Sequence, residues 1–143
     1  MKRLLILLLL TAVTSLHAQE FIGCLTDSGW AETPRLRTTF KLTAEDFKHY
    51  NFETVTFSVD VASLSYHEVY VNGTKVGDRV LQPAVSQLDK RALNVRYDIS
   101  DLVHEGDNEI MLWLGQGWGR IYGTSAVVKA EVTRTVSDGE CGL

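Results

Sequence analysis

The sequence has few of the residues that hold small domains together through covalent bonds or metal ions. It contains two cysteines, Cys24 and Cys141, in 143 residues. An exported protein can join such a pair in a disulfide, but one pair is no framework, and both a bridged and an unpaired state remain open. His49, His67 and His104 are isolated from other ligands at metal-site spacing. We therefore expect no metal site and no cofactor.

Positive charge is also scarce. The chain has 14 Lys and Arg against 18 Asp and Glu, a net charge of −4. Loss of Lys2 and Arg3 with a cleaved leader would leave 12 basic residues and a net charge of −6. A protein that binds nucleic acid or anionic lipid carries a basic patch, and this sequence has none. We exclude both classes of partner.

Only one long apolar run is present, at Leu4–Val13. It is shorter than the roughly 20 residues that a spanning helix needs. Lys2 and Arg3 precede it, and small and polar residues ending at Ala18 follow, which is the order of a secretory signal. We predict a signal peptide at 1–18 and export to the periplasm or medium. Lipid attachment at Cys24 is not favoured, because polar residues separate it from the run.

Strict alternation of apolar and polar residues dominates the remaining sequence, which predicts half-buried strands. The alternating segments are 54–63, 93–99, 110–114 and 126–132, with a weaker one at 35–42. Helical periodicity appears only in short stretches near 44–50 and 100–105. Asn72-Gly73 lies between β-prone flanks and supplies the two positive-φ residues of a type I′ hairpin turn. We prefer this turn to the glycosylation site that Asn72-Gly73-Thr74 also spells.

These signals predict one all-β domain, a two-sheet sandwich or jelly roll, because short strands with turns between them must bury one face each against another sheet. We place the domain at 19–136 and a tail at 137–143. No repeat or linker interrupts it.

The carboxylates offer no convincing pair for glycoside hydrolysis, which needs two of them facing each other across a sugar. Asp60 falls on the polar face of a predicted strand, Asp98 and Asp101 flank a turn, and 105–109 is predicted to be a solvated loop. We assign no catalytic residue.

The most unusual segment is Gly115-Gln116-Gly117-Trp118-Gly119-Arg120, with Tyr122 just beyond. It lacks the full spacing of a dinucleotide loop, so we reject nucleotide binding. Glycines permit close backbone approach, and an indole with a guanidinium suits a sugar face and its hydroxyls. Gln116, Trp118, Arg120 and Tyr122 are therefore candidates for contact with a ligand or a neighbouring domain. The alternative is that Trp118 caps the core and Arg120 pairs with a surface carboxylate.

From Thr54 to Arg120 the chain resembles the N-terminal β-sandwich module of bacterial α-L-rhamnosidases, glycoside hydrolase family 78. The matching motifs are Tyr70-Val71-Asn72-Gly73, Val76-Gly77-Asp78, Leu81-Gln82-Pro83, Asp89-Lys90-Arg91, Tyr97-Asp98-Ile99-Ser100-Asp101-Leu102, Glu105-Gly106-Asp107-Asn108 and Gly115–Arg120. Several are also similar to the sugar-binding sandwich of β-galactosidase-like enzymes, which implies a galactose-binding-like fold. Two positions depart from the pattern, since the family leads us to expect aromatic residues where Leu88 and Asn94 stand.

The resemblance implies that the catalytic carboxylates belong to a separate (α/α)6 barrel, so we carry none over and expect no hydrolysis by this chain alone. We expect a fragment, a truncated reading frame or a stand-alone module. Its implied partner is a catalytic (α/α)6 domain or a rhamnose-containing glycan. We lean towards the domain, because a module from a large enzyme evolves against its neighbours. The alternatives are a carbohydrate-binding module and the sugar-binding domain of a β-galactosidase-like enzyme.

Overall fold

The computed structural model describes residues 20–50 and 53–138. The predicted signal peptide at 1–18 and Cys141 lie outside the described residues, so the signal stays a prediction and both states of the cysteine pair stay open. In the described part, no helix is long and apolar enough to cross a membrane.

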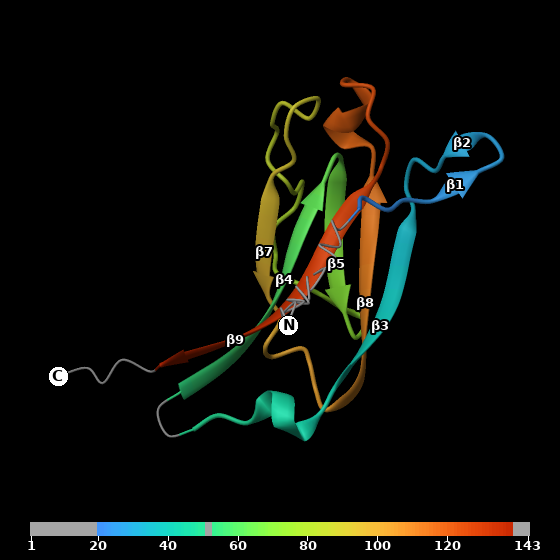
Figure 1. Ribbon diagram of the computed structural model, residues 1–143. Helices are drawn as coiled ribbons and strands as arrows, with labels where there is room; N and C mark the ends of the chain where they lie inside the picture. Colours follow the sequence, from blue (N-terminus) through green and yellow to red (C-terminus); the bar gives the residue numbers. More distant parts are fainter. Residues whose placement is uncertain (1–19, 51–52, 139–143) are drawn as a thin grey trace, which may run out of the picture.

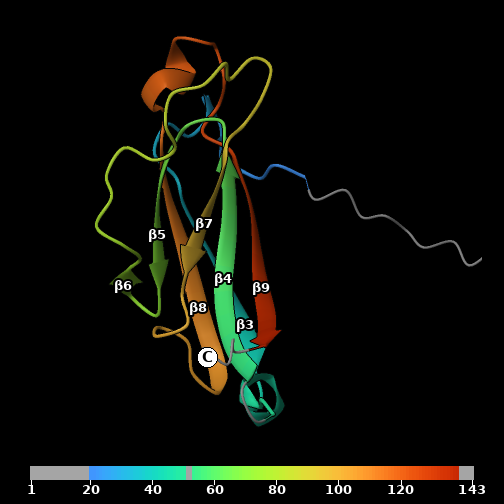
Figure 2. The same cartoon turned by 90° about the vertical axis from the view of Figure 1, so that its left-hand side faces the viewer.

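Two antiparallel sheets face each other and form the body of the molecule (Figures 1 and 2). One sheet has the order β3-β8-β5-β6, formed by Arg35–Leu42, Gly106–Gly115, Tyr66–Val71 and Thr74–Lys75. The other has the order β7-β4-β9, formed by Asn94–Asp98, Glu53–Ser63 and Val128–Asp138. β1 (Leu25–Thr26) and β2 (Gly29–Trp30) form a separate small hairpin. The prediction of an all-β chain is confirmed.

The alternating apolar residues predicted from the sequence form much of the core. Along β4, Phe57, Val59 and Val61 are buried while the residues between them are more accessible. Ile110 and Leu112 of β8 belong to the same cluster, so apolar side chains of both sheets meet between the layers. Each strand contributes every second side chain because successive side chains of a strand point to opposite faces.

Helical structure is limited to two 3-10 turns among the described residues, η1 (Ala44–Phe47) and η2 (Gly117–Arg120). The first lies within the weak helical stretch predicted near 44–50. The second stands where a loop was predicted. β9 continues to Asp138, two residues beyond the predicted end of the domain.

The β5–β6 hairpin turns at Asn72 and Gly73, whose φ angles are 49° and 80°. Both values are positive, as a type I′ turn requires. The Asn72 side chain also donates to the carbonyl of Leu102 and to Oδ1 of Asn108, each at 2.8 Å, and its Oδ1 accepts from the Glu109 amide. The turn is thereby tied to β8 as well as to its own hairpin.

The prediction of a solvated loop at 105–109 is wrong, because β8 begins at Gly106 and Asn108 is only 1% exposed. Asn108 accepts hydrogen bonds from the His104 amide and from Asn72, and its Nδ2 donates to the carbonyls of His104 and Gly106. A polar residue is tolerated in this buried position because its hydrogen-bonding groups are satisfied. Sequence polarity alone suggested exposure.

We predict that Asn108→Ala lowers the free energy of unfolding by about 1–3 kcal/mol, because the amide and carbonyl of His104 lose their Asn108 partner and Asn72 Nδ2 loses one of its two acceptors. Asn94→Ala is the matched control, since Asn94 is exposed and its amide donates only to Asp60. Urea unfolding of both variants measures the difference. Equal stability of the two variants would show that the Asn108 network contributes nothing.

Candidate functional site

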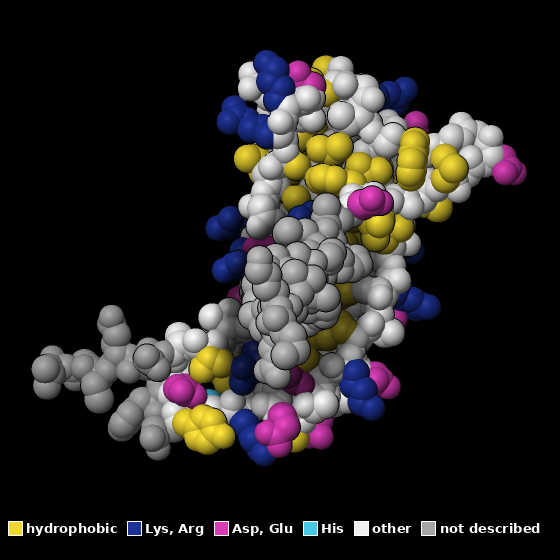
Figure 3. Space-filling view, in the orientation of Figure 1, with side chains coloured by type: hydrophobic (Ala, Val, Ile, Leu, Met, Phe, Trp, Pro, Cys, Tyr) yellow, Lys and Arg dark blue, Asp and Glu magenta, His cyan; other side chains and the backbone are white. Residues whose placement is uncertain are grey.

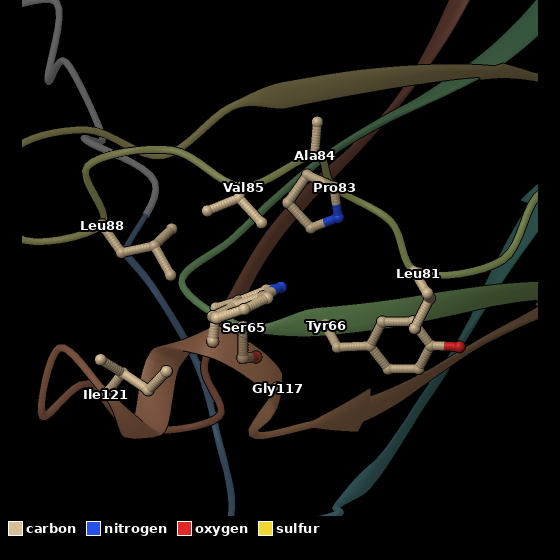
Figure 4. Close-up of a pocket in the computed structure, with 10 residues that line it drawn as sticks. Ser65, Tyr66, Leu81, Pro83, Ala84, Val85, Leu88, Gly117 and Ile121 are labelled. Carbon is tan, nitrogen blue, oxygen red and sulfur yellow. The ribbon is translucent and has the colours of Figure 1, made fainter.

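A cavity of about 420 Å³ opens at the end of the sandwich where β5 begins. We call it the end cavity. Its lining residues are Ser65, Tyr66, Leu81, Pro83, Ala84, Val85, Leu88, Gly117, Trp118 and Ile121. Figure 4 shows Val85, Pro83 and Leu88 along one wall and Ile121 and Gly117 along the other. The lining is largely apolar, with the hydroxyls of Ser65 and Tyr66 and the indole N–H of Trp118 as its side-chain polar groups.

The first wall is the connection between β6 and β7. Because β6 has only two residues, most of the β5 edge would lack a partner, but Gln82 forms a β-bridge with His67. The His67 amide donates to the Gln82 carbonyl at 2.7 Å. The peptide between Gln82 and Pro83 is cis, and Leu88 is buried. The backbone bridge between Gln82 and His67 holds this wall against the sheet.

The second wall is η2, and its glycines are needed for contacts inside the protein. A Cβ at Gly119 would lie 2.6 Å from the Leu64 carbonyl oxygen and from Oγ1 of Thr124. A Cβ at Gly117 would lie 3.1 Å from Cβ of Tyr66, and one at Gly115 would lie 3.2 Å from Cδ1 of the same ring. The close backbone approach that the sequence suggested is therefore made to this chain itself.

Trp118 is 56% exposed, so the alternative that it caps the core is wrong. Arg120 and Tyr122 are exposed as well, and Gln116 is half-buried just before η2. None of the four ion pairs among the described residues includes Arg120. Of the four candidate residues, Trp118 lines the end cavity and the other three do not.

Sequence reasoning missed most of the cavity. Leu81 and Pro83 fall in a motif that carries the family resemblance, but nothing in the sequence showed that they line a cavity with Trp118. The two departures from the family pattern have different places. Leu88 lines the cavity, whereas Asn94 lies on the other sheet, where its Nδ2 donates to Asp60 at 3.0 Å.

A chain of buried polar groups lies next to the cavity, centred on His67, which is 1% exposed. The Ser63 hydroxyl donates to the Ser65 carbonyl at 2.5 Å, so its oxygen accepts from Nδ1 of His67 at 2.7 Å. Nε2 then accepts from the Tyr97 hydroxyl at 2.9 Å. This order follows because a neutral imidazole has one donor and one acceptor. Burial lowers the pKa of His67 to about 4 and raises that of Tyr97.

We predict that acid destabilises the protein through His67. Its ordinary pKa is 6.5, so between that pH and about 4 the unfolded chain binds a proton that the folded chain does not. Stability is full above pH 6.5 and falls by about 3 kcal/mol as the pH drops to about 4. Thermal melting at a series of pH values should show this fall in the wild type and in His49→Gln, an exposed control.

His67→Gln removes the titrating group, so its melting temperature should change little between pH 6.5 and 5, whatever its stability at neutral pH. A slope equal to that of the wild type would contradict the assignment to His67.

Four carboxylates have a pKa below the ordinary value, and each is held by a neighbouring donor. The Arg96 guanidinium lowers the pKa of Asp60, and the Lys75 ammonium followed by the Tyr70 hydroxyl lowers that of Glu68. Hydrogen bonds from Thr43 and from Ser100 lower the pKa of Asp46 and of Asp98, respectively. In the described ranges no group of three or more His, Cys, Asp and Glu residues is arranged to hold a metal ion.

Two packed antiparallel sheets with a cavity walled by connections at one end define a β-sandwich module with a preformed concave site. Residues 53–139 match the family model described as the α-L-rhamnosidase N-terminal domain. The chain belongs to this family, and the resemblance seen in the sequence is confirmed.

Two curated relatives are α-L-rhamnosidases of Formosa agariphila. One is 43% identical over 68 residues, 48% of this chain and 7% of the relative. The other is 35% identical over 51 residues, 36% of this chain and 6% of the relative. The chain thus matches less than a tenth of the length of these relatives.

Solved structures give the same result at the level of the fold. The α-L-rhamnosidase of Aspergillus terreus has a TM-score of 0.65 at 19% identity, covering 86% of this chain and 16% of that one. The enzyme of Dictyoglumus thermophilum has a TM-score of 0.56 at 29% identity, covering 75% and 12%. That of Streptomyces avermitilis, solved with L-rhamnose, has a TM-score of 0.60 at 21% identity, covering 76% and 11%.

Proposed function

We propose that this chain is a non-catalytic accessory module of an exported α-L-rhamnosidase-like glycoside hydrolase, and that it contacts glycan through the end cavity. The observation that carries the proposal is the exposed indole of Trp118 on the lining of a preformed concave site. Ligand sites are typically concave and mostly apolar, with a few placed polar groups.

The apolar lining suits a deoxy sugar better than a fully hydroxylated one. L-Rhamnose carries a methyl group at C6, and one face of its ring is covered by C–H groups. Trp118 offers a flat apolar surface to such a face, while Leu81, Val85 and Ile121 offer contacts for the methyl. Burial of apolar surface of this kind stabilises a complex by about 25 cal/mol per Å² before the costs of association.

The direction in which the carboxylate pKa values are shifted supports a non-catalytic role. A glycosidase acid needs a raised pKa so that it holds its proton at neutral pH. The shifted carboxylates in the part of the chain that the structure describes are all lowered. Export remains supported by the order of charged, apolar and small residues in 1–18, and the jelly-roll, galactose-binding-like class by the resemblance.

A second candidate function is docking on the catalytic (α/α)6 domain. Val80, Leu81, Val85, Ile121 and Tyr122 are all exposed around Trp118. Figure 3 shows hydrophobic side chains exposed towards the end of the molecule that carries η2. Apolar patches of this kind on a folded domain often mark contact with another domain.

We predict that the purified protein binds L-rhamnose and a rhamnosyl disaccharide saturably in calorimetric titration. Trp118→Ala should weaken binding about tenfold, as expected when one aromatic contact is lost. Trp30→Ala is the control, because Trp30 is 48% exposed but does not line the cavity. The melting temperature of Trp118→Ala should stay close to that of the wild type, since the indole is exposed.

Two results would contradict the proposal that the end cavity contacts glycan. An absence of saturable heat, together with self-association that Trp118→Ala abolishes, would favour docking. Loss of about 3–5 kcal/mol of stability in Trp118→Ala would instead give the indole a packing role.

We also predict that the chain releases 4-nitrophenol from 4-nitrophenyl α-L-rhamnoside no faster than buffer does. The physical reason is that a catalytic acid must hold its proton at neutral pH. Asp60 lines one hollow together with Glu131, but the Arg96 guanidinium lowers the pKa of Asp60. Turnover that disappears on replacement of a single carboxylate would show that this chain carries catalytic machinery.

A further inference from the structure

Tyr66 lines two hollows. One is the end cavity, and the other, of about 210 Å³, lies on the outer face of the four-stranded sheet. We call the second one the sheet hollow. It is lined by Thr33, Tyr66, Glu68, Trp113, Leu114 and Gly115. Because Tyr66 lines both, the two hollows lie next to the same residue.

Glycines at and just after the end of β8 leave room for the Tyr66 side chain. Gly117 lines the end cavity and Gly115 lines the sheet hollow. A side chain at either position would meet the Tyr66 side chain, at 3.1 Å from Cβ for Gly117 and 3.2 Å from Cδ1 for Gly115. Tyr66 can therefore lie against the backbone at the end of β8, next to the lining of both hollows.

The sheet hollow combines an aromatic surface with charged groups on both sides. Trp113 of β8 is 38% exposed, and strand register places Arg35 of β3 on one side of it and Glu68 of β5 on the other. The Arg35 guanidinium carbon lies 4.5 Å from the centre of the indole ring. Cation–π contact of this kind holds the planar donor group at the sheet surface.

The Glu68 carboxylate and the Arg35 guanidinium can each form a further hydrogen bond to a ligand. Glu68 accepts from the Tyr70 hydroxyl at 2.8 Å and from Nζ of Lys75 at 2.6 Å, which fix the carboxylate in place. A carboxylate has about four lone-pair sites, so these donors and the distant Tyr66 hydroxyl leave one for a further donor. The Arg35 guanidinium takes part in no ion pair among the described residues.

We propose that the end cavity and the sheet hollow form one continuous track that binds two or more neighbouring residues of a glycan chain. A deoxyhexose residue fills the apolar end cavity against Trp118. The next residue lies against Tyr66 and the part of Trp113 that the guanidinium leaves exposed, with its hydroxyls donating to Glu68 and accepting from Arg35. The two sites differ in polarity, and they match the apolar and hydroxylated parts of such a chain. This proposal rests on the proposed function and adds a second sugar site to it.

The dependence of binding affinity on the length of the glycan tests whether the two hollows form one track. The full chain is titrated with L-rhamnose and with α-linked rhamnose di- and tetrasaccharides. Affinity should rise at least tenfold from the monosaccharide to the tetrasaccharide, because the longer ligand makes a second aromatic contact. Trp113→Ala should remove most of this gain and leave monosaccharide affinity unchanged, whereas Trp118→Ala should weaken every ligand. Trp30→Ala is again the control.

Two further variants keep the test decisive if Trp113→Ala does not fold. Trp113→Tyr keeps an aromatic surface and should retain most of the gain, while Arg35→Ala should reduce it. A tetrasaccharide that binds no more tightly than L-rhamnose, or a gain that survives both Trp113→Ala and Arg35→Ala, overturns the track but leaves the proposed function standing. If no saccharide binds at all, the proposed function fails, and the track fails with it.

Discussion

The close approach of η2 to the start of β5 is the contact on which the site depends. Leu64 joins the two elements, because its carbonyl accepts from the Thr124 hydroxyl at 2.9 Å and its amide donates to the Val127 carbonyl. Gly119 packs against the same carbonyl, with no space for a side chain. This packing closes the end of the sandwich and sets one wall of the cavity. Trp118 lies on η2, so the fold fixes the backbone from which its indole projects.

The opposite wall of the cavity, the β6–β7 connection, is attached to the core through His67. The backbone of His67 holds Gln82 of the β6–β7 connection, and its ring joins Ser63 of β4 to Tyr97 of β7. His67 therefore links both sheets and the cavity wall. Buried polar groups of this kind are stable only when they are all satisfied. A charge on this imidazole would break the order of donors and acceptors, which couples the integrity of the wall to the protonation of a core residue.

The sequence predicted the features that depend on local pattern. Alternation located β4, β7, β8 and β9 because a strand with one buried face has a period of two, and Asn72-Gly73 located the hairpin because few other residues adopt positive φ. It did not predict that Asn108 is buried, since polarity favours exposure unless the partners are known. Nor did it predict the cavity, whose walls lie more than twenty residues apart in the chain and meet only through tertiary packing.

The three glycines near Trp118 show how one signal can have two physical causes. Their number suggested a backbone that approaches a ligand, but they are required by the Tyr66 side chain and the Leu64 carbonyl. They let η2 pack closely against Leu64 and Tyr66, while Trp118 on the same turn stays exposed. We infer that Trp118, Tyr66 and Trp113 contact one glycan chain on a single track.

The three tryptophans allow this claim to be tested in one experiment, because each gives a separate indole N–H signal in a ¹H–¹⁵N NMR spectrum. Titration with an α-linked rhamnose tetrasaccharide should shift the signals of Trp118 and Trp113 with the same dissociation constant. The signal of Trp30, which lies on the β1–β2 hairpin, should stay in place. Unchanged Trp118 and Trp113 signals at saturating ligand, or equal shifts of all three, would contradict the account.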